Sequence, residues 1–100
     1  MIRITRQGET SLKLEGHAGS DVYGKDLVCA AVSALVLTLA EAVKDKPGAE
    51  VILKPGDSQI RCDQEAEAVF DCICKGFALL AEKYPEYVCY SRQNACRGGS

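Results

Sequence analysis

The sequence predicts a single α+β domain in which a five-stranded, mostly antiparallel sheet carries two helices, in the order β-β-α-β-β-α-β. Its 100 residues are 47% hydrophobic and 26% charged, which suits one modest core. Short segments of alternating apolar and polar residues come in pairs separated by turns, and two longer segments have apolar residues at helical spacing. We expect residues 1–92 to form this domain and residues 93–100 to form a flexible tail.

The first strand pair is predicted near the N-terminus. Ile2 and Ile4 alternate with polar neighbours, and so do Leu12 and Leu14. A Gln-Gly pair at residues 7 and 8 lies between the two segments and marks a turn. The two segments therefore predict a β-hairpin.

A long helix is expected next, from residue 27 to about Lys44. Asp26 is a suitable N-cap, and the sequence "KPG" at residues 46–48 ends the helix. Apolar residues cover this segment nearly all the way round: Leu27, Val28, Ala30, Ala31, Val32, Ala34, Leu35, Val36, Leu37, Leu39, Ala40 and Val43. Such a helix lies at the centre of a domain or partly in a subunit interface, so we expect a homodimer.

A second strand pair, a second helix and a last strand follow. "EVILK" and "SQIRC" are joined by the turn "PGD", and the helix from Asp63, a good N-cap, stops before Pro85. Gly76 is a weak point within that helix. "EYVCY" makes the last strand. The polar face of the helix is expected to be solvated: Glu67, Asp71, Lys75 and Glu82.

Composition argues against several classes of function. A net charge of -2 and a pI near 5.3 leave no basic footprint for nucleic acid. The N-terminus lacks the apolar core of a signal peptide, and the longest apolar run, 27–40, is shorter than the roughly 20 residues of a membrane span. We therefore expect a cytoplasmic protein with no membrane contact.

The six cysteines are expected to be reduced thiols, since no signal peptide directs the chain to an oxidising compartment. The chain has no C-x-x-C pair and a single His, so neither a metal site nor a cofactor is predicted. Five cysteines are assigned to packing: Cys62, Cys72, Cys74, Cys89 and Cys96.

The stretch "GHAGSDVYGKDLVC" at residues 16–29 comes close to a phosphate-binding loop. Gly19 is followed after four residues by Gly24 and Lys25, but Asp26 stands where that loop requires Ser or Thr. A carboxylate there would repel a polyphosphate. The stretch therefore predicts a chemistry other than nucleotide binding.

Cysteine chemistry fits this stretch better. Cys29 is expected in the first turn of the helix, where the helix dipole favours a thiolate, and His17 is the one imidazole that could take its proton. Asp26 could cap the helix, orient His17, or do both, and Ser33 lies on the same helical face as Cys29. A cysteine in an apolar helix is also common as a packing residue, so a structural or interaction module stays equally open at this point.

The segment "GHAGSDVYGKDLVCAAVSAL" resembles the signature of the ribosomal-processing cysteine protease family, Prp. In that signature a His-x-Gly stretch leads through Gly-x-Asp into a Val-Cys-Ala-Ala-x-Ser helix. The resemblance rests on these positions: His17, Gly19, Gly24, Asp26, Cys29, Ala30, Ala31 and Ser33.

The resemblance implies a cytoplasmic cysteine endopeptidase that acts as a homodimer, with Cys29 as nucleophile and His17 as general base. The implied substrate is a short N-terminal extension of large-subunit ribosomal protein twenty-seven. The glycines at 16, 19 and 24 would then belong to a mobile loop beside the site. A non-catalytic ribosome-assembly module, or a thiol-dependent acyltransferase or redox sensor, remains as the alternative.

Overall fold

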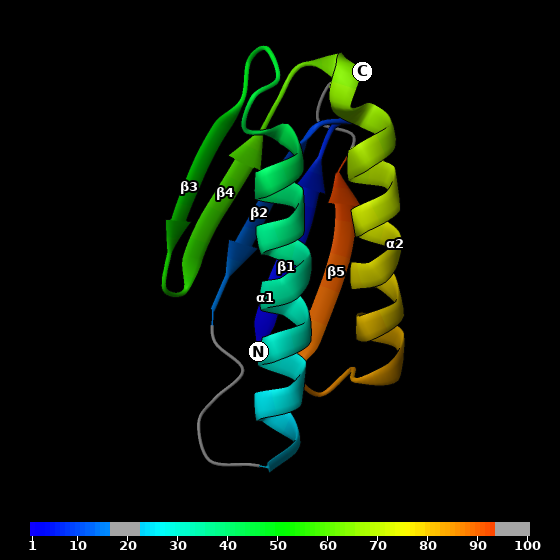
Figure 1. Cartoon of the computed structure of the whole chain (residues 1–100). Helices are drawn as coiled ribbons and strands as arrows, with labels where there is room; N and C mark the ends of the chain where they lie inside the picture. The colour runs from blue at the N-terminus through cyan, green and yellow to red at the C-terminus, as the bar shows by residue number, and fades with distance from the viewer. Residues whose placement is uncertain (17–22, 94–100) are drawn as a thin grey trace.

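The computed structural model describes residues 1–16 and 23–93, and of residues 23–26 the backbone alone. Its elements follow the predicted order β-β-α-β-β-α-β (Figure 1). The strands are β1 (Ile2–Gln7), β2 (Ser11–Glu15), β3 (Glu50–Lys54), β4 (Asp57–Arg61) and β5 (Val88–Gln93). The helices are α1 (Tyr23–Val43) and α2 (Glu67–Lys83), and a short 3-10 turn at Gln64–Ala66 precedes α2. The predicted fold class is confirmed.

The five strands form one mixed sheet in the order β3-β4-β2-β1-β5. Three neighbouring pairs are antiparallel, and β5 runs parallel to β1. A parallel neighbour requires a crossover connection, and α2 supplies it by carrying the chain from β4 past β2 and β1 to the far edge. β5 ends at Gln93, one residue beyond the predicted boundary of the domain, while the rest of the expected tail lies outside the described residues.

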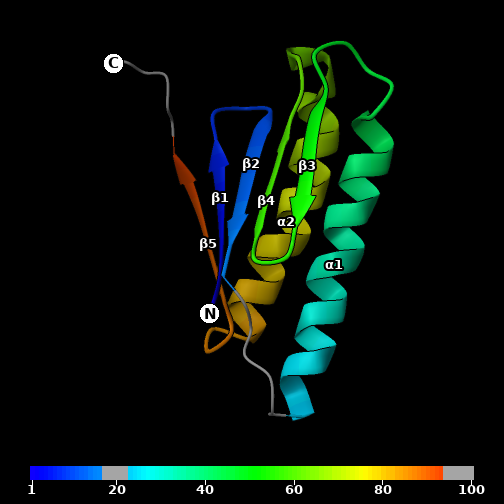
Figure 2. The ribbon, with the colours of Figure 1, turned by 90° about the vertical axis from the view of Figure 1, so that its left-hand side faces the viewer.

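Both helices of the described residues pack on one face of the sheet, and neither lies on the other face (Figure 2). Because side chains alternate along a strand, Ile2 and Ile4 of β1 are buried beneath the helices whereas Arg3 is exposed. The largest fully buried side chains lie between the two layers: Ile4, Leu12, Val28, Leu39, Val43, Ile60, Phe70, Phe77 and Val88. None of the helices among the described residues is long and apolar enough to cross a membrane.

The start of α1 differs from the prediction. The helix begins at Tyr23 and not at residue 27, so Asp26 is an internal residue and not the N-cap. Gly24 also belongs to the helix and not to the preceding loop. A glycine costs a helix only about 1 kcal/mol, and an acidic residue is favoured anywhere in the first turn, so neither residue prevents the extra turn.

Two leucines of α1 are exposed in the single chain. Val28, Val32 and Val36 are buried against the sheet, while the side chain of Leu27 is 64% exposed and that of Leu37 is 57% exposed. The apolar surface of this helix is therefore only partly covered within one chain.

One residue of the predicted solvated face of α2, Asp71, is 47% exposed and also makes an ion pair with a buried side chain. The side chain of Arg6 is 2% exposed, and its Nη1 lies 2.7 Å from Oδ1 of Asp71. The same guanidinium donates from Nε and Nη2 to the carbonyl oxygen of Glu9, at 3.2 and 2.6 Å. Asp71 thus neutralises a buried charge, a role that the helical pattern alone does not reveal.

Candidate functional site

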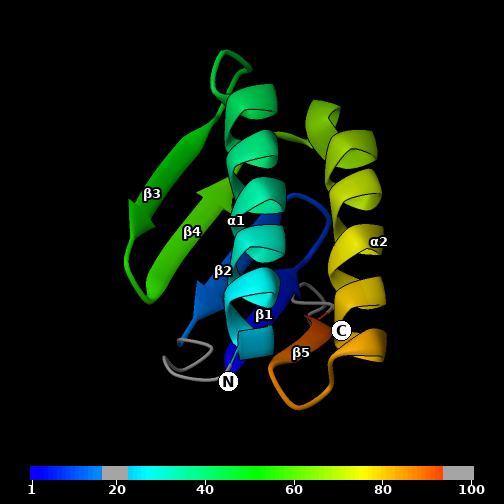
Figure 3. The same ribbon diagram turned by 60° about the horizontal axis from the view of Figure 1, so that its bottom comes forward.

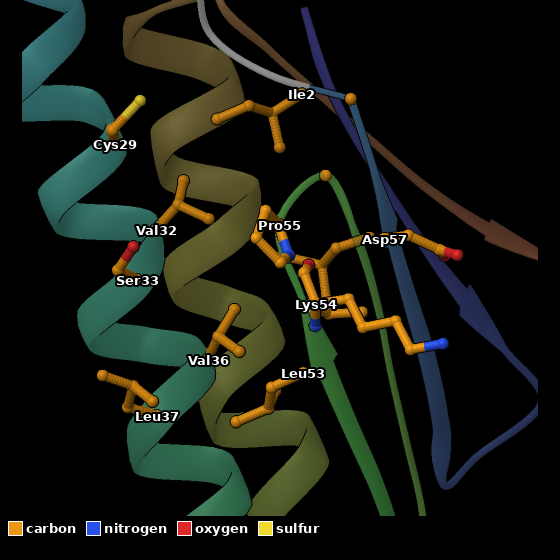
Figure 4. A pocket seen from close by; sticks show the side chains of 14 residues that line it. Ile2, Cys29, Val32, Ser33, Val36, Leu37, Leu53, Lys54, Pro55 and Asp57 are labelled. Carbon is orange, nitrogen blue, oxygen red and sulfur yellow. Dashed lines mark hydrogen bonds between the residues drawn. The ribbon is translucent and has the colours of Figure 1, made fainter.

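A pocket of about 440 Å³ lies between α1 and the tip of the β3–β4 hairpin (Figure 4). The base of the pocket is formed by Ile2, Leu14 and Gly16. One wall consists of α1 residues: Cys29, Val32, Ser33, Val36 and Leu37. The opposite wall is formed by residues 53–58 of the hairpin. This hollow contains two of the residues that the sequence singles out in α1.

Cys29 and Ser33 occupy successive turns of α1 and both line the pocket. The thiol of Cys29 is half-buried, and the side chain of Ser33 is exposed. Within the described part of the chain, no hydrogen bond joins the Ser33 hydroxyl to this sulfur. Ser33 is therefore placed beside the candidate nucleophile without being bonded to it.

The position of Cys29 changes the argument for its activation. Cys29 is the seventh residue of α1 and belongs to the second turn, not the first as predicted. Its backbone N–H faces the helical carbonyl four residues earlier, and the field of a helix end falls off within the first turn. Activation by the helix dipole, which the sequence predicts for a residue of the first turn, therefore does not apply to Cys29.

Gly16 brings the chain that leads to His17 into the same pocket. Its φ of +91° lies in the left-handed region, and a Cβ at this position would overlap the carbonyl oxygen of Met1. Its N–H donates a 3.0 Å hydrogen bond to the carbonyl oxygen of Gly56, in the hairpin turn. Gly16 is thus held between the N-terminus and the hairpin. His17 itself lies outside the described residues.

The expected mobile loop between Gly16 and Gly24 is shorter than predicted. Gly16 is fixed by its contacts at one end, and Gly24 belongs to α1 at the other. Residues 17–22, Gly19 among them, lie outside the described residues.

The hairpin wall presents two apolar side chains to α1. Pro55 and Leu53 face the helix, while the side chains of Lys54 and Asp57 are directed away from it (Figure 4). The Ser58 hydroxyl donates to the carbonyl oxygen of Lys54 at 3.2 Å and accepts from its N–H at 3.3 Å, which holds the turn. Sequence reasoning identified this turn but did not place it in the site, because no local pattern shows which helix a hairpin faces.

The other cysteines differ in exposure. Cys62 and Cys74 are buried, as their assignment to packing predicts, whereas Cys72 and Cys89 are exposed and that assignment is wrong for them. Cys96 lies outside the described residues. Among the described residues that line the pocket, Cys29 is the one thiol.

The buried thiol of Cys74 is in a setting that opposes ionisation. Burial raises the pKa of Cys74, although its hydrogen bond with Tyr90 and the nearby Arg6 act in the other direction. Burial and the same hydrogen bond raise the pKa of Tyr90 to about 12. Both groups are therefore neutral at pH 7, and Cys74 is not a candidate nucleophile.

Comparison with known proteins points to one family. A family model described as "Cysteine protease Prp" matches residues 1–89. No curated protein matches the chain by sequence. Several solved structures share the fold.

One solved structure is the essential ribosomal processing protease Prp from S. aureus with a covalently linked product peptide. It is 22% identical, with a TM-score of 0.79, and the match covers 93% of this chain and 100% of that one. The S. aureus protease with a substrate peptide is 21% identical, with the same TM-score and the same coverage. SMU.848 from Streptococcus mutans is 28% identical, with a TM-score of 0.68, over 92% of this chain and 91% of that one.

Proposed function

The chain belongs to the Prp family of cysteine proteases, and we propose that it removes the N-terminal extension of large-subunit ribosomal protein twenty-seven in the cytoplasm. One observation carries the proposal: the pocket that contains Cys29 also contains Gly16, the residue directly before His17. Gly16 and Cys29, which begin and end the stretch 16–29, thus line the same pocket. The S. aureus structures, which hold a substrate or a product peptide of a ribosomal processing protease, support a peptide as the ligand.

The reaction begins with proton transfer. His17 takes the proton of the Cys29 thiol, and the thiolate attacks the carbonyl carbon of the scissile peptide bond. The carbon–nitrogen bond of the resulting tetrahedral intermediate breaks as His17 protonates the departing amine. Water then hydrolyses the thioester and restores the thiol. No metal or cofactor takes part in this scheme.

The oxyanion requires hydrogen-bond donors. The N–H groups of the first four residues of a helix have no partner within the helix, and in α1 these are residues 23–26. We assign the oxyanion to these groups, since residue 26 precedes Cys29 by about 4.5 Å of helix rise. Asp26 is assigned to orienting His17, and Ser33 to supporting the sulfur.

The pocket suits a peptide. Its walls carry apolar side chains from α1 and backbone from the hairpin, and the two charged side chains of the hairpin tip turn away from it (Figure 4). Such a lining accepts the apolar side chains and amide groups of an extended chain.

We also assign a homodimer to the working enzyme. Leu27 and Leu37 are exposed on α1, and the exposed Ala30 and Ala34 lie between them along the helix. Small residues between two leucines allow a close approach of a second helix. The outward face of α1 is therefore the proposed contact between the two copies.

The test is mass spectrometry of the extended ribosomal protein after incubation with the wild-type chain, with Cys29→Ala and with Cys72→Ala. Cys72 is an exposed cysteine on α2 that does not line the pocket, so it is the matched control. We expect a single cut within the extension by the wild type and Cys72→Ala, and none by Cys29→Ala. An uncut but bound substrate with all three proteins would point to an assembly module and overturn the protease. Cleavage by Cys29→Ala would overturn the nucleophile.

A further inference from the structure

The outer strand of the sheet, β3, borders the pocket and has an open edge. β3 ends the strand order and pairs with β4 on one side; its other side has no strand partner among the described residues. All five of its residues are exposed. In Figures 1 and 3 it lies outside the area that α1 covers.

The register shows which backbone groups are free at this edge. The bond from the Gly16 N–H to the Gly56 carbonyl marks a hydrogen-bonded pair between the strands β2 and β4. Because bonded and non-bonded pairs alternate in an antiparallel ladder, Ser58 and Ile60 bond toward β2, and the residues between and beside them bond toward β3.

The alternation continues into β3. The bonded partners there are Lys54, Ile52 and Glu50. It follows that Val51 and Leu53 direct their N–H and carbonyl groups outward, away from β4. These two residues offer two donors and two acceptors to an added strand.

The same two residues face the pocket side of the sheet. Val51 and Leu53 lie opposite Ile60 and Ser58, and Ile60 is buried beneath the helices. Leu53 lines the pocket, yet its side chain is 45% exposed. One residue therefore belongs both to the pocket that holds Cys29 and to the open edge.

The edge lacks the usual protection against pairing. Proteins guard exposed edges with charges, prolines or bulges placed along the strand. In β3 the charges stand only at the ends, Glu50 and Lys54, and the three central residues are Val51, Ile52 and Leu53. An unguarded apolar edge of this kind indicates a strand-forming partner.

We propose that the substrate peptide adds to β3 as a further strand, bonded to the backbone of Val51 and Leu53, and that this pairing leads the scissile bond to Cys29. The inference rests on the proposed function, since it names how the same site holds its substrate. The peptide is the occupant, rather than a second copy, because the edge is continuous with the pocket through Leu53. Alternate peptide side chains then face the apolar pocket walls, and the main-chain bonds add affinity with little demand on sequence.

Amide hydrogen exchange tests the pairing directly. The sample is the full-length Cys29→Ala protein, and the probe is a synthetic peptide that spans the junction of the ribosomal-protein extension. We expect exchange at the N–H groups of Val51 and Leu53 to slow about tenfold or more at saturation. The N–H of Ile52, already bonded to β4, is the internal control and changes less. Peptide binding that leaves Val51 and Leu53 unchanged would overturn the inference.

A pair of variants tests the pairing through kinetics. Val51→Pro removes an outward N–H that β4 does not use, and Val51→Ala keeps it while shortening the side chain. We expect Val51→Pro to raise KM about tenfold more than Val51→Ala does, with kcat nearly unchanged, because the added strand loses one bond. Equal KM values in the two folded variants would contradict the pairing. If Val51→Pro does not fold, the hydrogen-exchange experiment still tests the pairing, because it leaves the sequence of β3 unchanged.

The outcomes separate this inference from the proposed function. Cleavage of the peptide by the wild type without protection of β3 would overturn the pairing and leave the protease intact. Protection of β3 without cleavage would support the pairing and overturn the protease. Protection that appears without peptide and grows with protein concentration would assign the edge to a second copy and overturn the pairing.

Discussion

Replacing Gly16 with alanine should damage the enzyme more than its position at a strand end suggests. An L-residue at a φ of +91° carries a backbone cost of roughly 1–2 kcal/mol. The new methyl group would also overlap the carbonyl oxygen of Met1, and relieving such an overlap typically costs about 1–3 kcal/mol. The sum is a loss of roughly 2–5 kcal/mol in the free energy of unfolding.

Gly8 provides a matched control at the opposite end of β2. Its φ is +73°, so Gly8→Ala carries a similar backbone cost, but no atom lies within 4 Å of the added Cβ. The difference in the free energy of unfolding between the two variants, measured in urea, therefore reports the cost of the overlap alone. We expect Gly16→Ala to be less stable than Gly8→Ala by about 1–3 kcal/mol.

Activity should separate the two variants further. Gly16 directs the chain toward His17, and a misplacement of about 1 Å in a catalytic group can cost about 100-fold in rate. We expect a loss of that order in kcat/KM for Gly16→Ala and a nearly wild-type value for Gly8→Ala, measured on the extension peptide below the unfolding temperature. Equal stability and equal kcat/KM in the two variants would refute the reasoning that Gly16 anchors the site.

Three further predictions concern the rest of the fold. Asp71→Ala leaves the buried Arg6 with the carboxylate of Glu9 alone, 3.9 Å from its Nη2, among the described residues, and should lower the free energy of unfolding by about 1–3 kcal/mol in urea titrations. Glu82→Ala, an exposed change of equal charge, should stay within about 0.5 kcal/mol. The folded pKa of Tyr90 is raised to about 12 from 10.0, so its contribution is present below pH 10 and is lost as pH rises through 12. Between pH 9 and pH 12 the wild type should therefore lose roughly 1–2 kcal/mol more than Tyr90→Phe, after allowance for solvent screening. Leu27→Asp should yield a monomer in sedimentation equilibrium, and a wild-type monomer well above micromolar concentration would contradict the proposed dimer.

Local patterns predict most of the elements of this fold. Both hairpins, both helices and the end of α1 follow from alternation, helical spacing and turn residues near each boundary. The polar end of β5 could not be predicted in this way. Residues 91–93 carry no apolar alternation, and they form a strand because β1 lies alongside, with Gln7 opposite Gln93.

Two residues show how distant contacts decide what a pattern leaves open. Gly76 reads as a weak point of α2, yet a Cβ there would come within 2.9 Å of a Leu35 methyl carbon, so the glycine allows α1 to pack closely. Arg6 occupies a core-facing position of β1 that alternation reserves for apolar residues. Its burial depends on Asp71, which is 65 positions away in the sequence and adjacent only in the fold.

The predicted site was a Cys29–His17 pair with supporting residues and a glycine loop from one stretch of the chain, and the structure adds a wall from the distant β3–β4 hairpin. Exposure does not select the nucleophile, because Cys72 and Cys89 are both more exposed than Cys29. The helix dipole does not select Cys29 either, since this residue lies beyond the first turn of α1. What distinguishes Cys29 is a pocket with the hairpin as its far wall and Gly16 at its base.

The proposed catalysis also depends on residues that take no part in the reaction itself. In the proposed reaction the Cys29 thiol gives its proton to His17, so the rate of cleavage depends on the chain that leads to residue 17. The direction in which the chain enters residue 17 is set by Gly16, which bonds to Gly56 and lies against Met1. Under the two proposals, the β3–β4 turn therefore contacts the residue before the base and also belongs to the hairpin whose open edge binds the substrate. We expect a change in that turn to alter both the rate of cleavage and the binding of peptide.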